Sequence, residues 1–238
     1  MQNLIFKIQS SESYADSLGM NYINIHGEEC GLDSALEDAL YGVQQVGVPP
    51  YGHFTVNGKL PMADIFAYGS NKCVSQRVKD ILDTFEVPNH YYPIKFIRKN
   101  KSAPKHLNYY MMGLGSQEID CIDITQTTAL YRDRETREQK SFCFGDGIPP
   151  PSRINLNEYT KIVLNEDALK GHHMCKPQLL IQRVRFPVLT IISTELACAF
   201  RKESITGADY YYPEEFPERY HIRNKRIEKM PLDCSCLD

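Results

Sequence analysis

Short apolar runs separated by polar turns occur along the whole chain, and this pattern predicts strands more often than helices. The first run, Leu4–Gln9, contains alternating and β-branched residues and is bounded by a serine-rich polar segment. A second run, Tyr22–Ile25, ends at Gly27. Further strands are predicted at residues 90–99, 106–115, 119–124, 141–144 and 160–165 and within 179–193.

Helical spacing of apolar residues occurs in three segments. Residues 33–46 carry such a pattern behind Asp33 or Ser34 as a possible N-cap. Ser75 is positioned to cap a helix that ends at Val87–Pro88. The third helix is predicted to start at Ser193 or Thr194, with Gly207 beyond its end.

The order of these elements predicts an α+β fold with mixed or antiparallel sheets, a few helices and possibly two subdomains. Strands are not separated by regular helices, as a doubly wound sheet requires. The polar, basic segment 99–105 is the candidate boundary. We therefore expect an N-terminal subdomain over 1–100, a C-terminal subdomain over 101–222, and a polar tail over 223–238.

The net charge of the chain and the distribution of its acidic residues indicate which kinds of partner it binds. The chain of 238 residues has a net charge of −3, which does not suggest binding to nucleic-acid phosphates. Residues 1–60 contain two basic and seven acidic side chains. No basic residue occurs between Lys7 and Lys59, and five of the acids gather around the start of the first predicted helix, where they predict an acidic partner-binding face. They are Glu28, Glu29, Asp33, Glu37 and Asp38.

No apolar run approaches the ~20 residues of a membrane span, and the N-terminal segment lacks the apolar stretch of a secretory signal. We therefore expect a cytoplasmic protein that binds neither membrane nor nucleic acid directly. The eight cysteines are scattered, without a CxxC pair. They predict reduced thiols, with no structural zinc and no obligatory disulfide.

Motifs that fix catalytic chemistry are not found. His172 and His173 near Cys175 do not form a metal site if they lie on a strand, because neighbouring side chains then point to opposite faces. Asp120 and Asp123 are interpreted as the solvated ends of a strand, with Thr125 available for local hydrogen bonding. We predict no catalytic residue, no metal site and no cofactor.

A cluster of tyrosines, acids and one phenylalanine near the C-terminus predicts a second partner-binding segment. Tyrosine beside proline supplies rigid contact area with a polar end, as protein interfaces use. The alternative is that the cluster folds back onto its own domain. Its residues are Tyr210, Tyr211, Tyr212, Glu214, Glu215 and Phe216.

Four segments, taken in order, resemble a known family. They are SQRVKDILDTF, YYMMGLGSQEIDCIDI, KIVLNEDALKG and TIISTELACAFRKESITGADYY. The chain resembles, over about residues 73–212, the Myxococcus-type immunity protein family of bacterial polymorphic toxin systems, formerly a domain of unknown function. The strongest part is the closing module, in which an aliphatic strand, a serine cap, a helix and an Ile-Thr-Gly turn follow one another.

The resemblance implies a non-enzymatic inhibitor that binds and neutralises a cognate antibacterial toxin domain in the producing cell. Such toxins include secretion-system effectors, and the partner would be a nuclease, an ADP-ribosyltransferase or another enzyme. Two alternatives remain open at this point. The chain could be a cytosolic thiol or carboxylate hydrolase, or a regulatory binding module unrelated to toxins.

Overall fold

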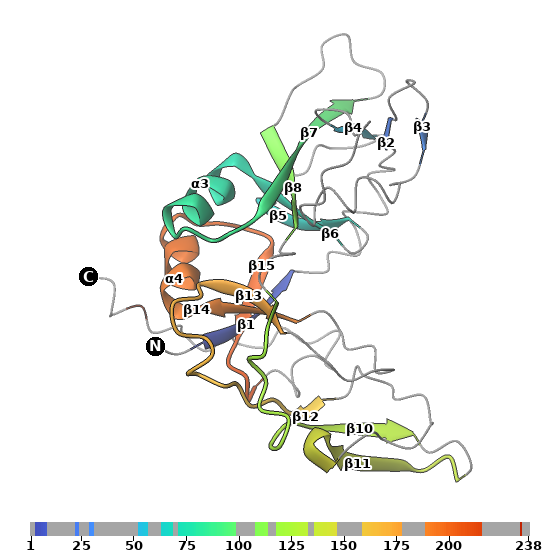
Figure 1. Cartoon of the computed structure of the whole chain (residues 1–238). Coiled ribbons are helices and arrows are strands. Elements are labelled where there is room, and N and C mark those ends of the chain that lie inside the picture. The colour runs from blue at the N-terminus through green and yellow to red at the C-terminus, as the bar shows by residue number, and fades with distance from the viewer. Residues whose placement is uncertain are drawn as a thin grey trace. The chain divides into compact units, whose positions relative to one another are not determined.

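The computed structural model describes residues 3–8, 22–23, 29–30, 52–56, 63–68, 71–98, 108–113, 118–132, 136–146, 159–177, 189–215 and 234. The chain divides into two compact units (Figure 1). Unit 1 comprises Met1–Lys7, Glu118–Cys198 and Tyr210–Asp238, and unit 2 comprises Ile8–Gln117 and Ala199–Asp209.

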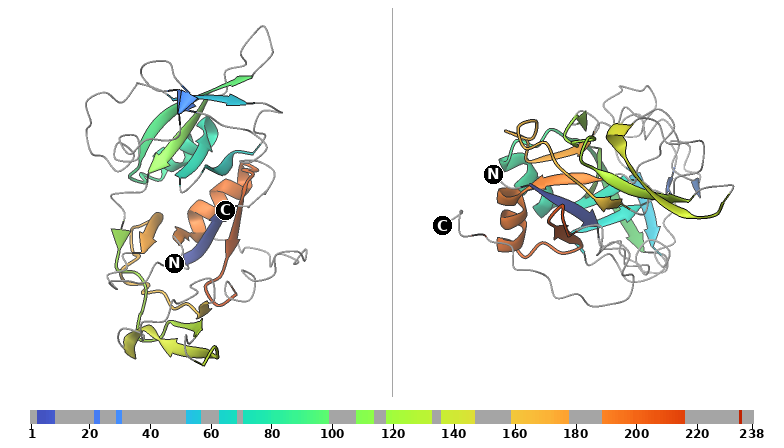
Figure 2. Two further views of the ribbon diagram at one scale, coloured as in Figure 1. Left: turned by 90° about the vertical axis from the view of Figure 1, so that its right-hand side faces the viewer. Right: turned by 90° about the horizontal axis from the view of Figure 1, so that it is seen from below.

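A five-stranded sheet in unit 1 brings the start of the chain together with its last third. Its strands, in spatial order, are β15 (Ala208–Tyr211), β1 (Asn3–Ile8), β14 (Thr190–Ser193), β13 (Met174–Pro177) and β9 (Glu118–Ile119). β1 pairs antiparallel with β14, with Leu4 opposite Ile192. Blue β1 accordingly lies beside orange β14 (Figures 1 and 2). The strand predicted at Leu4–Gln9 is confirmed.

Unit 1 also contains a three-stranded antiparallel sheet, β11 (Gln139–Cys143), β10 (Thr128–Arg132) and β12 (Tyr159–Lys161), and the short 3-10 helix η1 (Phe144–Asp146). Arg132 of β10 lies opposite Gln139 of β11, so these two strands pair antiparallel up to this point. One buried core joins side chains from both sheets of this unit. Its members are Ile5, Cys121, Ile122, Ala129, Phe144, Ile162, Leu169, Cys175, Leu189 and Ile191.

The sheet of unit 2 has seven strands. In spatial order they are β3 (Glu29–Cys30), β2 (Tyr22–Ile23), β4 (Gly52–Val56), β7 (His90–Arg98), β8 (Asn108–Gly113), β6 (Asn71–Ser75) and β5 (Ile65–Tyr68). β4 and β7 run parallel, whereas the other pairs are antiparallel. The predicted α+β class with mixed sheets is confirmed. No helix in the described ranges is long and apolar enough to cross a membrane.

Helix α3 (Gln76–Thr84) forms where its cap and apolar spacing predict it. The backbone N–H of Val78 donates to Ser75 Oγ at 3.4 Å, which satisfies one of the unpaired donors of the first turn. Val78 and Leu82 are buried, and the helix packs against β6 and β8. Burial of two such side chains contributes about 1.5–3 kcal/mol each. The helix ends with Glu86 in the left-handed region, at φ 50°.

Helix α4 (Thr194–Lys202) begins in unit 1 and continues into unit 2. Ser193 is its cap, since Ser193 Oγ accepts the backbone N–H of Leu196 at 3.2 Å. After the last turn, the N–H of Ile205 donates to the carbonyl of Phe200 at 2.8 Å. Ser204 takes the left-handed conformation that this type of helix end requires. The sequence prediction of this helix and its serine cap is confirmed.

Some predictions concern segments that the structure treats differently or does not describe. The helix predicted over 33–46 and the segment 99–105 lie outside the described residues. The strands before and after 99–105, β7 and β8, pair with each other. β1 pairs with β14 and is grouped with the second half of the chain in unit 1, and the division into 1–100, 101–222 and 223–238 stays a prediction.

One expectation about the thiols is wrong. Cys198 and Cys234 form a disulfide, with their Cα atoms 5.6 Å apart. Cys73, Cys121, Cys143 and Cys175 are free. Cys198 lies on α4 and its partner is 36 residues further along the chain, so the pairing depends on tertiary structure that cysteine spacing alone does not reveal.

Gly207 is required where the turn after α4 meets the start of β5, within unit 2. It has φ +96°, and an added Cβ would lie 1.8 Å from the carbonyl oxygen of Ile65. This close approach allows the N–H of Ile65 to donate to the carbonyl of Thr206 at 3.0 Å. A side chain at this position is excluded by both backbone conformation and space.

Replacement of Gly207 by alanine is expected to lower the free energy of unfolding by more than about 3 kcal/mol, because backbone atoms must separate to admit the Cβ. Gly171→Ala is the matched control. Gly171 also has a positive φ, +77°, but nothing lies within 4 Å of its added Cβ. Its cost should be about 1 kcal/mol. Urea denaturation followed by circular dichroism compares them, and equal losses would contradict the close approach at Ile65.

Candidate functional site

The predicted aromatic segment leaves β15 in unit 1, and its first two tyrosines pack inward. The ring of Tyr210 lies against Phe6 of β1, with centroids 6.0 Å apart. Tyr211 packs against the buried core of unit 1. These contacts hold the start of the segment on its own unit.

The next four residues form a turn that faces solvent in part. The backbone N–H of Glu215 donates to the carbonyl of Tyr212 at 3.0 Å. Pro213 is buried, Tyr212 and Glu215 are half-buried, and Glu214 is exposed. Tyr212 and Glu214 are therefore accessible on a turn anchored by its neighbours. Phe216 lies outside the described residues.

The predicted acidic face is described only in part. Glu29 lies on β3, opposite Ile23 of β2. The side chain of Glu29 and the whole of the other four acidic residues lie outside the described part of the chain. They are Glu28, Asp33, Glu37 and Asp38. The acidic face remains a prediction.

The acidic loop between β9 and β10 is held by hydrogen bonds. The sequence predicted that Asp123 is solvated, but as part of a strand end. Asp123 Oδ1 accepts the backbone N–H of Thr125 at 2.9 Å and its hydroxyl at 2.6 Å. Gln126 donates to Oδ2 at 2.7 Å. The hydrogen bond from the Thr125 side chain, followed by that from Gln126, lowers the pKa of Asp123 and keeps it ionised.

This loop also exposes Ile124, which has 40% of its surface accessible. Among the described residues, Ile124 is the one large hydrophobic side chain that is exposed. Gly145 of η1 packs under the loop, since an added Cβ would lie 2.8 Å from Thr125 Cα. The expected local hydrogen bonding of Thr125 is confirmed. The exposure of Ile124 was missed, because an isoleucine in an alternating strand pattern is normally assigned to the core.

Ser193 and His173 resemble a catalytic pair, since Ser193 Oγ lies 2.9 Å from His173 Nδ1. The serine stands at a turn from strand to helix, where hydrolases place a nucleophile. Its surface is 0% exposed, however, and its oxygen accepts the helix N–H described above. The arrangement serves as a helix cap stabilised by a histidine, and it gives a substrate no access to the hydroxyl.

Comparison with family models decides the assignment. The model described as "Immunity protein family (Imm11)" matches residues 43–215, which is more than half of the chain. The chain belongs to the Imm11 immunity protein family. The match confirms the resemblance found over 73–212 and extends it toward the N-terminus. Comparison with curated proteins finds no match.

Membership in Imm11 connects the chain with toxin immunity in general.

Three of the free thiols are enclosed in the interior: Cys73, Cys121 and Cys175 are between 0% and 1% exposed. Burial raises the pKa of Cys73. The pKa of Cys175 is also raised, by its hydrogen bond to Cys121 and then by burial. Neutral, enclosed thiols such as Cys73 and Cys175 are inert packing groups.

No group of three or more histidine, cysteine or acidic side chains suited to a metal ion occurs among the described residues. His173 contacts Ser193, as given above.

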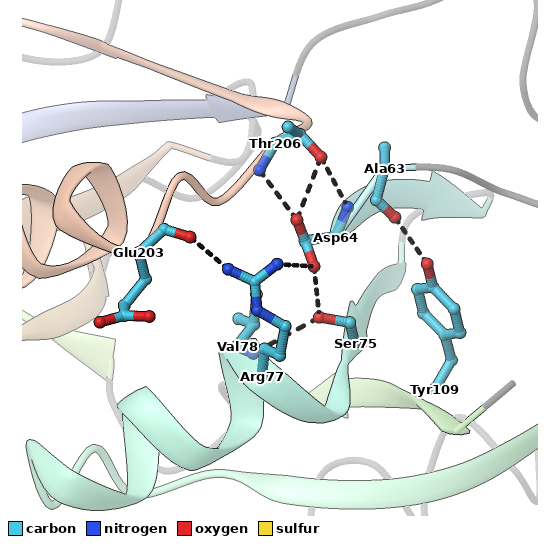
Figure 3. Close-up of polar contacts among 8 residues, drawn as sticks. All are labelled: Ala63, Asp64, Ser75, Arg77, Val78, Tyr109, Glu203 and Thr206. Atoms are coloured by element: carbon cyan, nitrogen blue, oxygen red, sulfur yellow. Dashed lines mark hydrogen bonds and ion pairs between the residues drawn. The ribbon is translucent and has the colours of Figure 1, made fainter.

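The closing module that carries the family resemblance holds unit 2 together through Asp64 (Figure 3). Asp64 Oδ2 accepts the backbone N–H and the hydroxyl of Thr206, each at 3.1 Å. Its Oδ1 accepts the hydroxyl of Ser75 at 2.9 Å. Arg77 lies 3.9 Å from the same oxygen and donates to the carbonyl of Glu203. One carboxylate thus joins the Ile-Thr-Gly turn to the start of α3.

Asp64→Ala is expected to lower the free energy of unfolding by about 2–3 kcal/mol, since it leaves several donors without their charged acceptor. Asp80→Ala is the control from the same unit. Among the described residues, the Asp80 side chain accepts a single exposed hydrogen bond, from Gln76 at 2.7 Å, so its loss should cost less than about 0.5 kcal/mol. If both variants denature at the same urea concentration, Asp64 does not have this role.

Proposed function

We propose that this Imm11 protein binds the active domain of a cognate antibacterial polymorphic toxin and neutralises it by forming a stoichiometric complex. The observation that carries the proposal is the family match over residues 43–215. The protein needs no reaction of its own for this function. Enclosed thiols and a serine committed to a helix cap are consistent with that.

The proposed place of action is the cytoplasm of the producing cell, which must survive its own secretion-system effector. The proposed partner is a toxin domain with a basic surface, such as a nuclease or an ADP-ribosyltransferase that handles anionic substrates. An acidic inhibitor surface steers association with such a partner. Direct binding to nucleic acid or membrane is not part of the proposal.

Two surfaces are proposed to contact the toxin. The first is the acidic set Glu28, Glu29, Asp33, Glu37 and Asp38. The second is the segment Tyr210–Phe216, in which Tyr210 and Tyr211 anchor the backbone and the turn presents Tyr212 and Glu214. A half-buried tyrosine on an anchored turn is a suitable contact residue, because little conformational freedom remains to be lost on binding.

Co-expression with the toxin encoded immediately upstream tests the function. Cells that carry both genes should grow, and the two proteins should purify as one complex. The toxin gene alone should stop growth, whereas a catalytically inactive toxin should be harmless with or without the chain. Continued toxicity in the presence of soluble, folded chain, with no complex recovered, would exclude the proposal.

Binding kinetics distinguish the two surfaces. Reversal of three of the five acids to lysine should slow association with a basic toxin and weaken its salt dependence. Tyr212→Ala should instead accelerate dissociation, by the equivalent of about 2 kcal/mol. Asp167→Lys is a single charge-reversal control at an exposed turn, where Asp167 pairs with exposed Lys170. Rates unchanged from wild type in both variant sets would exclude both surfaces and direct attention to the charged loop 132–140.

A further inference from the structure

The disulfide between Cys198 and Cys234 encloses the proposed toxin-binding segment. The two cysteines are 36 residues apart, and Tyr210–Phe216 lies between them. Both cysteines and this segment belong to unit 1. When the disulfide is closed, the chain that carries the segment is fixed at α4 and again at position 234. When it is open, the tail no longer has this covalent attachment.

We propose that the Cys198–Cys234 disulfide is a redox-operated tether that restrains the Tyr210–Phe216 segment and thereby sets the affinity for the toxin. The proposal rests on the proposed function and adds its regulation. Disulfides of cytosolic proteins are usually transient and redox-sensing, which fits a bond that opens and closes. Tyr210 and Tyr211 already hold the start of the segment on unit 1, so closing the loop acts on the turn that follows them and reduces the conformations available to that turn before it binds.

Among the cysteines whose side chains the structure describes, the surroundings favour reaction of an external thiol reagent with this pair. Cys234 is half-buried and accessible, whereas Cys198 is 2% exposed on α4. Cys121 and Cys175 contact each other but are enclosed in the core of unit 1. The half-buried Cys143 Sγ lies 3.0 Å from the carbonyl oxygen of Thr125, to which it donates. Reaction therefore begins at Cys234.

Glutathione disulfide is the oxidant in the closing reaction. The Cys234 thiolate attacks one sulfur of glutathione disulfide, forms a mixed disulfide and releases one glutathione thiolate, which takes up the proton lost by Cys234. The Cys198 thiolate then attacks the Cys234 sulfur and releases the second glutathione, which takes up the proton of Cys198. The protein loses two electrons and two protons, and glutathione disulfide becomes two molecules of glutathione. Excess glutathione reverses both steps by attack at Cys234.

The experiment uses the full chain equilibrated with glutathione disulfide or with reduced glutathione. Peptide mapping by mass spectrometry reports the cross-link, and hydrogen–deuterium exchange reports the order of residues 208–216 without any toxin. Affinity for the toxin domain encoded upstream is measured in the same two buffers. The β10–β11 hairpin of the same unit serves as the internal exchange reference.

In the wild type, oxidation should cross-link positions 198 and 234, slow exchange in residues 208–216, and tighten toxin binding about tenfold, the effect of ordering one or two large side chains in advance. Cys234→Ser should behave like the reduced wild type in both buffers. Cys236→Ser should behave like the wild type, because it keeps both members of the pair. Cys198→Ser repeats the test at the helix, although its buried position makes Cys234→Ser the more informative variant.

A missing cross-link overturns the proposal, as does a cross-link that changes neither exchange nor affinity. Loss of the redox effect in Cys236→Ser also overturns it, since the operative pair would then be a different one. If the toxin fails to bind in both buffers while the difference in hydrogen–deuterium exchange persists, the proposed immunity function is excluded, whereas the restraint by the disulfide is supported. The two failures are therefore distinguishable.

Discussion

The carboxylate of Asp64 is the interaction on which the arrangement of unit 2 depends. It accepts hydrogen bonds from Thr206, which follows α4, and from Ser75, which caps α3. Next to it, Gly207 permits two backbone segments to meet at a distance that no side chain allows. Residues near 64 and near 206 are far apart in the sequence, so this contact joins two distant segments of the chain within unit 2.

This geometry gives a physical reason for part of the closing module on which the family resemblance rests. The Ile-Thr-Gly turn was identified in the sequence as part of a resemblance, without a chemical reason for those residues. The structure supplies one, since Thr206 provides two donors and Gly207 the missing Cβ. The recognisable residues of the closing module therefore specify the fold.

Local elements could be predicted from the sequence, whereas pairings between distant segments could not. Ser75 and Ser193 cap helices where short-range spacing indicates, because capping depends on residues within one turn. The pairing of Leu4 with Ile192 and the disulfide between Cys198 and Cys234 depend on the folded chain. A division into consecutive subdomains follows naturally from sequence alone, because nothing local indicates that the first strand joins the last third.

The candidate site, like the fold, could be predicted from the sequence only in part. The chemistry of the tyrosine-rich segment was visible in its composition, but which tyrosines pack inward depends on Phe6 and on the core of unit 1. Ile124 shows the reverse case, since an apolar residue expected in a strand lies exposed on a rigid acidic loop. Patterning predicts the average burial of a segment, while hydrogen bonds such as those of Asp123 decide individual positions.

Titration of the toxin's own catalytic activity with the purified chain tests the central claim most directly. A stoichiometric inhibitor that binds far below the working concentration predicts a linear fall in activity that reaches zero at about one equivalent. The toxin recovered from the complex should be chemically intact and active again after separation. Complete and time-dependent loss of toxin activity at a small fraction of one equivalent would contradict the account, because it would mean that the chain acts as an enzyme on its partner.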